Sequence, residues 1–255
     1  MEITIELLSL LFVVAIVAGL LDTLAGGGGL ISLPALILGG VPPLAALGTN
    51  KLQGSMGTAT ATYMMIKNKR INLVNVKLLM LSAFIGAVFG TVAVQFVDAE
   101  LLSFVIPIVL LIIAVYFLIS PKPTETPKIA RFSESQYKKF VIPLIGYYDG
   151  MFGPGTGSFF AASGVYCRAH DLITATAIAK PLNFATNIAS LMVFLLAGKI
   201  VWVIGILMML GQMIGAWLGS HCLFRINPAY LRSIVVLMCT GMLIKYVDSM
   251  GWLGV

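Results

Sequence analysis

The sequence has few charged residues: Asp, Glu, Lys and Arg make up 10% of the chain, and 59% of its 255 residues are hydrophobic. A water-soluble domain carries about 25% charged residues, so this composition is typical of an integral membrane protein. Alternation of apolar and polar residues with a period of two is also missing, which argues against a β-barrel. Several apolar runs instead approach or exceed the roughly 20 residues that a helix needs to cross a bilayer.

Cysteine and histidine are scarce as well. The three cysteines have no metal-ligand spacing, their odd number gives no disulfide framework, and two histidines are too few for a metal site by themselves. We therefore predict no cofactor and no metal ion. The net charge is +6, but the sequence offers no basic face with stacking aromatic residues, so we expect no nucleic-acid partner.

Basic residues are concentrated in two stretches, at 67–70 and in the long polar stretch at 120–139. Positively charged loops mark the cytoplasmic side of a membrane protein. We expect both stretches to be cytoplasmic. The protein is then a multi-pass protein of the plasma membrane, which in a bacterium is the inner membrane, with lipid around it.

Two halves of the chain repeat one design. IGAVFG at 85–90 recurs as IGAWLG at 214–219, and Lys51 recurs as Lys180 at the same spacing of 129 residues. Both halves also contain Asp-x-x-x-Gly-x-Gly, which starts at Asp22 in the first half and at Asp149 in the second. Motifs that recur in one order indicate a duplication. The predicted parts are a first repeat at 1–119, a cytoplasmic linker at 120–139 and a second repeat at 140–255.

The recurring IGA motif is a small-xxx-small pattern, with Gly86 and Gly90 in one copy and Gly215 and Gly219 in the other. Such patterns let two helix backbones approach closely. We expect helix packing here and no ligand.

Each repeat contains a short apolar run, a Gly-rich break, a second short run and three full-length helices. In the first repeat these elements lie at 7–21, 25–29, 30–40, 44–66, 73–97 and 101–119. In the second repeat they lie at 140–152, 153–157, 158–167, 171–197, 200–224 and 228–247. The predicted fold is an all-α polytopic membrane protein of about eight helices, with Gly-broken half-helices near the midplane.

The short runs leave two topologies open. Fifteen helical residues span about 22 Å and eleven about 16 Å, so neither run crosses the ~30 Å hydrocarbon core alone. If the two runs form a re-entrant hairpin, the repeats are inverted. If they form one broken crossing helix, the repeats are parallel. We favour inverted repeats, because broken helices that meet at mid-depth are common in that architecture.

The Gly-rich breaks predict a binding site. Irregular backbone at membrane depth survives only where protein buries it or water lines it. Backbone N–H groups at the start of the next half-helix attract anions, and glycine lets a ligand come close. The alternative is close helix crossing at small residues. The candidate residues are Gly26, Gly27, Gly28, Gly29, Gly153, Gly155, Thr156 and Gly157.

Lys51 and Lys180 each lie nine residues after the start of a predicted helix, about 13 Å along its axis and near mid-depth. A charge there costs at least ~2.5–3.5 kcal/mol, which makes it a functional candidate. The alternative is a structural ion pair with Asp22 or Asp149, for which a substrate anion can compete. The two aspartates are also candidates for carrying a coupling proton.

Amide side chains accompany both lysines. Asn50 and Gln53 flank the first, and Asn183 and Asn187 follow the second at i+3 and i+7, on its helix face. Neutral amide donors beside a cation suit a tetrahedral or pyramidal oxyanion. Hydrogen bonding between helices uses the same residue types.

Two enzyme classes share features with the breaks. GPGTGS at 153–158 superficially resembles a phosphate-binding loop, but it lacks the Gly-Lys-Ser/Thr that engages nucleotide and metal. Paired intramembrane aspartates are also a feature of aspartyl proteases, where the two carboxyl groups share a proton. Here each aspartate belongs to a duplicated break and a lysine is available to it. We therefore predict that the protein is not an enzyme.

The stretch DTLAGGGGLISLPALILGGVPPLAALGTNKLQ, followed by YDGMFGPGTGSFF, strongly resembles the sulfite exporter TauE/SafE family of permeases, in particular its YfcA-like branch. The resemblance covers about Gly19 to Val247. It implies about eight helices and small sulfur-containing anions, such as sulfite or organosulfonates, as substrates. This chain carries lysine in GTNKLQ, where other branches often have a Gly-Thr-Ser-type stretch.

The predicted function is therefore secondary transport of a small anion by alternating access, with protons as a candidate coupling ion. A channel or a carrier for another small solute is the second hypothesis, and an intramembrane enzyme is the third. No feature of the sequence requires a second chain.

Overall fold

A computed structural model describes residues 3–119, 129–222 and 240–241. Within these ranges all regular secondary structure is helical. Five of the described helices are long and apolar enough to cross a membrane, over the residues Ile5–Ala25, Leu73–Val94, Ala99–Tyr116, Leu172–Leu196 and Trp202–Cys222. The predicted all-α polytopic membrane fold is confirmed.

The first helix, α1 (Ile5–Ala25), begins at Thr4, whose hydroxyl accepts a hydrogen bond from the N–H of Leu7. It ends at Gly26, which has a left-handed backbone (φ 70°) that glycine adopts without a Cβ penalty. The 21 residues of α1 rise about 31 Å. The prediction of a short run at 7–21 was therefore wrong, because the helix continues four residues further and stops only at the first glycine of the break.

The rest of the first half follows the predicted order. The short helix α2 (Gly29–Leu38) comes after the break, and then three long helices complete the half: α3 (Pro43–Lys67), α4 (Leu73–Val94) and α5 (Ala99–Ile119). The ends of these helices differ from the predicted ones by a few residues at most.

The second half begins with one continuous helical stretch made of α6 (Glu134–Gln136), a π-helical turn (Tyr137–Val141) and α7 (Ile142–Met151). A capping box between Ser133 and Gln136 starts it. Six residues of the predicted 120–139 linker are therefore helical. The remaining helices are α8 (Thr156–Arg168), α9 (Leu172–Leu196) and α10 (Trp202–Cys222). The helix predicted at 228–247 falls almost wholly outside the described residues.

Both short helices turn back along the helix before them. In the first half, a Cβ on Gly39, after the end of α2, would lie 3.1 Å from the side chain of Leu7, near the start of α1. In the second half, the Tyr137 hydroxyl at the start of the helical stretch lies 2.8 Å from Ser163 Oγ, late in α8. Each break therefore forms a hairpin.

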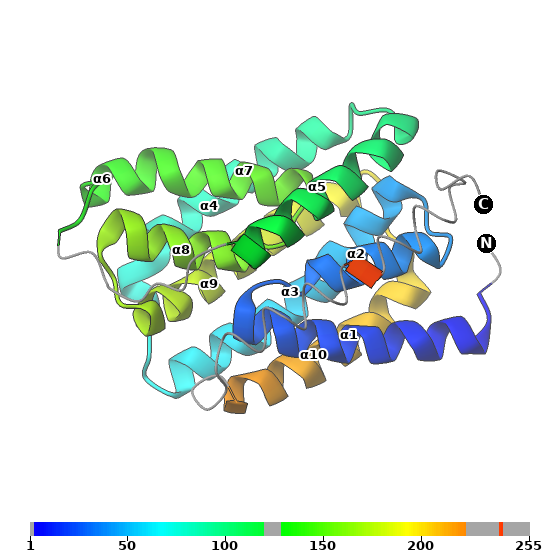
Figure 1. Ribbon diagram of the computed structural model, residues 1–255, viewed down its shortest axis with the longest axis horizontal. Coiled ribbons are helices and arrows are strands. Elements are labelled where there is room, and N and C mark those ends of the chain that lie inside the picture. The colour runs from blue at the N-terminus through cyan, green and yellow to red at the C-terminus, as the bar shows by residue number, and fades with distance from the viewer. Residues whose placement is uncertain (1–2, 120–128, 223–239, 242–255) are drawn as a thin grey trace.

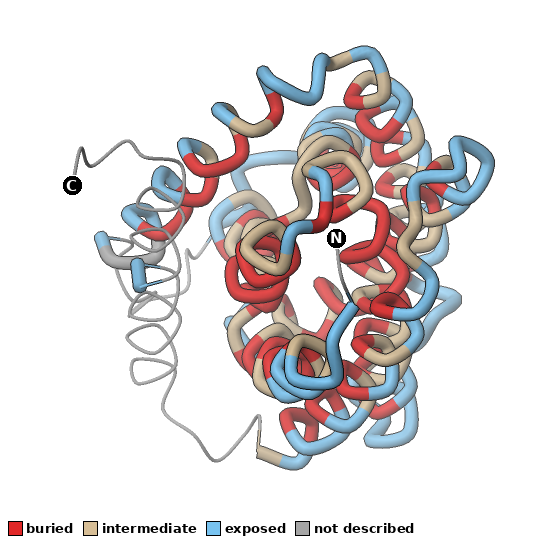
Figure 2. Tube along the Cα trace, turned by 90° about the vertical axis from the view of Figure 1, so that its right-hand side faces the viewer, coloured by how far each residue is buried: buried red, intermediate tan, exposed pale blue. Residues whose placement is uncertain are grey.

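The two halves pack through matching contacts. Helix α10 lies along α1, and α4 lies along α7, while α3 and α9 contact each other between these pairs. A Cβ on Gly90 would lie 2.8 Å from the carbonyl carbon of Tyr147, and one on Gly219 would lie 2.9 Å from the carbonyl oxygen of Leu20. The small-xxx-small prediction is confirmed, because these glycines let the backbones touch. Figure 2 shows the buried positions turned toward the centre of the bundle.

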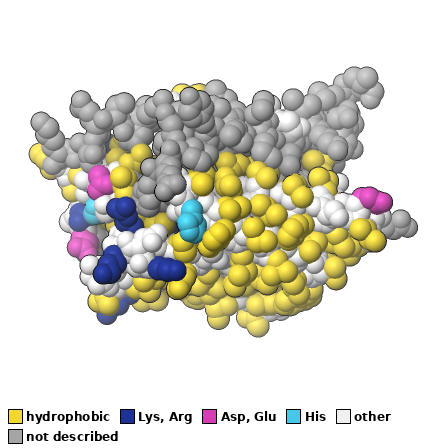
Figure 3. Space-filling model, turned by 90° about the horizontal axis from the view of Figure 1, so that it is seen from below, with side chains coloured by type: hydrophobic (Ala, Val, Ile, Leu, Met, Phe, Trp, Pro, Cys, Tyr) yellow, Lys and Arg dark blue, Asp and Glu magenta, His cyan; other side chains and the backbone are white. Residues whose placement is uncertain are grey.

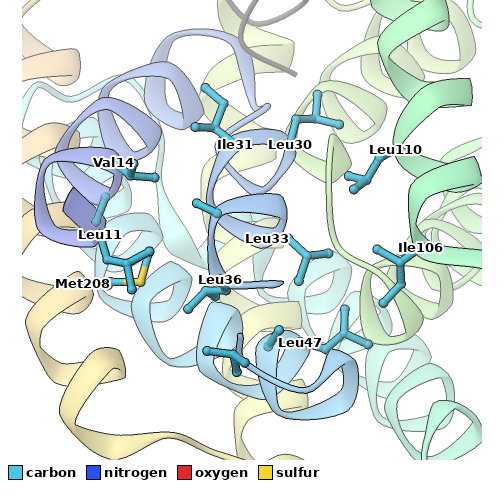
Figure 4. Packing of buried hydrophobic residues seen from close by; sticks show 14 of the residues in the cluster. Leu11, Val14, Leu30, Ile31, Leu33, Leu36, Leu47, Ile106, Leu110 and Met208 are labelled. Atoms are coloured by element: carbon cyan, nitrogen blue, oxygen red, sulfur yellow. The ribbon is translucent and has the colours of Figure 1, made fainter. Parts of the chain in front are cut away.

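The largest apolar core joins α2 to its neighbours. Leu30 and Leu33 of α2 lie with Leu11 of α1, Ile106 of α5 and Met208 of α10 in one cluster (Figure 4). The outer surface is also apolar over most of the length seen in Figure 3, whereas Lys and Arg side chains gather toward one end. That distribution suits a protein surrounded by lipid, with a basic end in the aqueous phase.

Candidate functional site

Lys51, on α3, forms a buried ion pair with Asp149 of the second half. Its Nζ lies 2.9 Å from Oδ1 of Asp149, and the two side chains are 1% and 2% exposed. The same ammonium donates a hydrogen bond to the backbone carbonyl oxygen of Asp149 at 2.5 Å. Lys51 therefore holds both the carboxylate and the backbone at the start of the second break.

Lys180, on α9, reaches across in the opposite direction. Its Nζ donates to the backbone carbonyl oxygen of Asp22 at 2.8 Å. The Asp22 carboxylate accepts the N–H of Gly28 at 3.2 Å, at the N-terminal end of α2. Each lysine thus binds the break of the other half. The two lysines differ in what they bind. Lys51 forms an ion pair with a carboxylate, whereas Lys180 donates a hydrogen bond to a carbonyl oxygen.

The two Gly-rich breaks touch each other. A Cβ on Gly157 would lie 2.7 Å from the Cα of Gly26, so glycine is required at this crossing. The Ser158 hydroxyl donates to the carbonyl oxygen of Ala25 in the other break. Figure 1 shows the hairpins in the interior of the bundle, where α1 meets α2 and α7 meets α8. The two breaks are therefore in direct contact.

Most of the backbone donors described at these breaks are bonded locally. Leu30 N–H donates to Gly27 O and Ile31 N–H to Gly28 O, while Gly28 N–H binds the Asp22 carboxylate. In the second break, the N–H and the hydroxyl of Thr156 both donate to Gly153 O, and the N–H of Ser158 donates to Gly155 O. Of the predicted break residues, Gly26, Gly28 and Thr156 therefore use their N–H groups within the breaks.

A small polar cavity lies where the breaks meet α3 and α9. The volume of the cavity is about 20 Å³, which is enough for one or two water molecules. Its lining residues are Asp22, Gly29, Asn50, Lys51, Gly54, Asp149, Gly153, Asn183, Asn187 and Gln212.

Half of the predicted site residues line this cavity, and the others stand around it. Gln53 donates to Asn50 Oδ1 at 2.7 Å, and Asn50 also accepts from the Ser32 hydroxyl at 2.7 Å. Asn187 donates weakly to Asn183, at 3.4 Å. The predicted residues outside the lining are Gly26, Gly27, Gly28, Gln53, Gly155, Thr156, Gly157 and Lys180.

Gln212, on α10, is a lining residue that sequence reasoning missed. Its side chain is buried, and it fits beside Gly57, where a Cβ would lie 3.1 Å from Gln212 Nε2. The signal that could have identified it is a single glutamine inside the apolar helix α10.

Two cavity oxygens have no hydrogen-bond partner in the described part of the chain: Oδ2 of Asp149 and Oε1 of Gln212. Buried polar atoms are normally bonded to protein or to water, so these two oxygens keep a capacity to accept hydrogen bonds that no described group uses. Among the described residues, no group of three His, Cys, Asp or Glu side chains is placed to hold a metal ion.

Comparison with known families gives one match across these elements. The sulfite exporter TauE/SafE family matches residues 11–246, which include both breaks and both lysines. The chain belongs to the sulfite exporter TauE/SafE family. It is therefore a membrane transporter of this family, and the resemblance seen in the sequence motifs is confirmed.

Curated relatives agree with this assignment. The chain is 39% identical over 252 residues to a probable membrane transporter protein of Haemophilus influenzae, with 99% of each chain covered. It is 39% identical over 254 residues to the probable membrane transporter protein YfcA of Escherichia coli K12, with 97% of this chain and 94% of the relative covered. It is 37% identical to the probable membrane transporter protein ORF9 of Sinorhizobium sp, covering 96% and 94%. No solved structure matches the chain.

Proposed function

We propose that this TauE/SafE transporter carries a small sulfur oxyanion or organosulfonate through the Lys51 cavity. The observation that carries the proposal is a lysine ammonium at mid-helix, lining a polar cavity beside amide side chains. A buried ammonium forms strong charge-assisted hydrogen bonds with an oxyanion, and amide groups add neutral donors. A bacterial inner membrane is the expected location.

The Asp149 carboxylate is proposed to compete with the substrate for Lys51. It occupies the ammonium at 2.9 Å, so a bound oxyanion must displace or replace it. Protonation of Asp149 would release the Lys51 ammonium to bind an anion. Asp149 is therefore the proposed carrier of a coupling proton, with one proton moved for each anion.

Alternating access is proposed to use inverted repeats. In Figure 1, α1 begins near the N-terminus at the right and runs to the left, whereas the stretch from α6 to α7 begins at the left and runs to the right. The hairpins and the exchanged lysine contacts fit a two-fold axis in the membrane plane, a plan that lets one repeat rock against the other around a central site.

The test is flux of radiolabelled sulfite and methanesulfonate into proteoliposomes that contain the purified protein. Saturable uptake, driven by a pH gradient, is expected for the wild type. Lys51→Met should lower uptake by at least about tenfold, because a charged hydrogen bond is lost. The exposed Lys199→Met is the matched control and should transport normally. Linear, non-saturable flux would favour the channel hypothesis, and equal uptake by Lys51→Met would refute the proposed site.

A further inference from the structure

We infer that the repeats provide one anion site and not two: the anion binds on the Lys51 side with Gln212 as a further contact, and Lys180 acts as a positioning residue for the α1 break. The inference rests on the proposed function and assigns different roles to two residues that the duplication makes equivalent.

The lysines differ in access to the cavity. Both side chains are buried, but Lys51 lines the cavity and Lys180 does not. Gly153 accounts for part of this access, since a Cβ there would lie 3.0 Å from Lys51 Nζ and crowd the ammonium. Lys180 Nζ is instead directed to the carbonyl oxygen of Asp22.

The amide side chains are distributed just as unequally. Asn50 of the first half lines the cavity. Three amide side chains of the second half line it too, namely Asn183, Asn187 and Gln212. The spacing of 129 that relates the lysines (180 − 51) leads from these residues back to smaller ones, namely Gly54, Thr58 and Ala83. The second half therefore provides three of the four lining amide groups, at positions where the first half has smaller side chains.

The small counterparts have other contacts. A Cβ on Gly54 would lie 3.3 Å from Asn187 Oδ1, so the absence of a side chain makes room for that amide. The Thr58 hydroxyl donates to the carbonyl oxygen of Gly54 in its own helix. Ala83 packs beside Gly146 of α7, where a Cβ would lie 3.2 Å from its Cα. No second amide-lined site can form from these residues.

Gln212 completes the site on the occupied side. It is buried in α10, lines the cavity, and its Oε1 has no partner among the described residues. A carboxamide offers N–H donors to an oxyanion and a carbonyl acceptor to a hydroxyl group, so it can contact a hydrogen oxyanion such as bisulfite at both ends. The site thus takes a singly protonated or singly charged oxyanion.

Two charge-neutral double variants test the inference, because removing a whole pair avoids an unpaired buried charge. They are Lys51→Met/Asp149→Asn and Lys180→Met/Asp22→Asn. The probe is sodium sulfite at pH 6.5, titrated calorimetrically into purified protein in detergent. The wild type should bind one anion per chain. The first variant should bind at least about tenfold more weakly. The second should lose clearly less affinity than the first, because it changes Asp22 of the lining but leaves the Lys51 ammonium in place. Its thermal stability should fall instead.

Gln212→Leu is the second arm, since it leaves every charge in place. We expect sulfite affinity to fall roughly 3- to 10-fold. The matched control is Gln95→Leu at the C-cap of α4, whose amide donates a hydrogen bond to the carbonyl oxygen of Thr91 outside the cavity lining. Two anions per chain, equal losses in the two double variants, or unchanged affinity in Gln212→Leu would overturn the inference. Absence of anion binding in the monodisperse wild type would refute the proposed function itself.

Discussion

Replacing Gly90 by alanine tests the close contact between α4 and α7. A Cβ at this position would lie 2.8 Å from the carbonyl carbon and 3.0 Å from the Cα of Tyr147. These are backbone atoms, so no side-chain rotation relieves the overlap and the two helices must separate. Forcing extra atoms into a packed core costs about 1–3 kcal/mol. Alanine in an unpacked helix position would instead stabilise by about 1 kcal/mol over glycine.

Whether Gly90→Ala lowers or raises the stability therefore shows whether the two helix backbones are in contact at this position. At about 2–4 °C for each kcal/mol in a chain of this size, Gly90→Ala should lower the midpoint of thermal unfolding by roughly 2–12 °C in a fixed detergent. Val92→Ala, on the exposed face of the same helix, is the control and should change stability by less than about 0.5 kcal/mol. A higher midpoint for Gly90→Ala would refute the described approach of α4 to α7.

Three further predictions concern the site and the start of α9. Asp149→Asn leaves the buried Lys51 ammonium without its carboxylate and should cost about 3–5 kcal/mol in thermal unfolding, whereas Lys51→Met/Asp149→Asn should recover most of that loss. Gly153→Ala places a Cβ 3.0 Å from Lys51 Nζ at a residue with φ 95°, so sulfite uptake should fall; normal uptake would contradict the assigned crowding. Asp171 caps α9, and hydrogen bonds from Thr174 hold the pKa of its carboxyl below the ordinary value. A carboxyl with a lowered pKa stabilises the fold at any pH above its unfolded pKa, and this contribution is lost as the pH falls through the folded pKa. Asp171→Ala should therefore lower the free energy of unfolding by about 1 kcal/mol at pH 7 and by progressively less below pH 4.

The elements that the sequence predicts well are those fixed by local physics. Glycine ends a helix wherever it occurs in a run, so both breaks were found at the right residues. The IGA motifs predicted close packing because small side chains have few other uses inside a membrane. The capping box at Ser133 and Gln136 is also a local signal. The start of this helix was not predicted, because the adjacent Lys138 and Lys139 suggested a polar linker.

The pairing across the two halves could not be predicted, because sequence spacing says nothing about which break a lysine reaches. Segment length also left the hairpin undecided, since the choice depends on where Gly39 returns relative to Leu7. Gln212 was missed for a different reason. One amide in a long apolar helix looks like a packing residue until its neighbours in space are known.

The exchange of lysines between the halves also bears on the order of synthesis. Lys51 is made 98 residues before Asp149, an interval of roughly 5–20 s at typical rates of translation. During that time α3 carries an amine whose ion-pair partner Asp149 has not been made, and the first half offers Asp22 as the carboxylate that lines the same cavity. Inserting the amine as a charge costs at least ~2.5–3.5 kcal/mol. The Lys51–Asp149 ion pair, and with it the contact between the two halves at this depth, can therefore form only after the second break has been made.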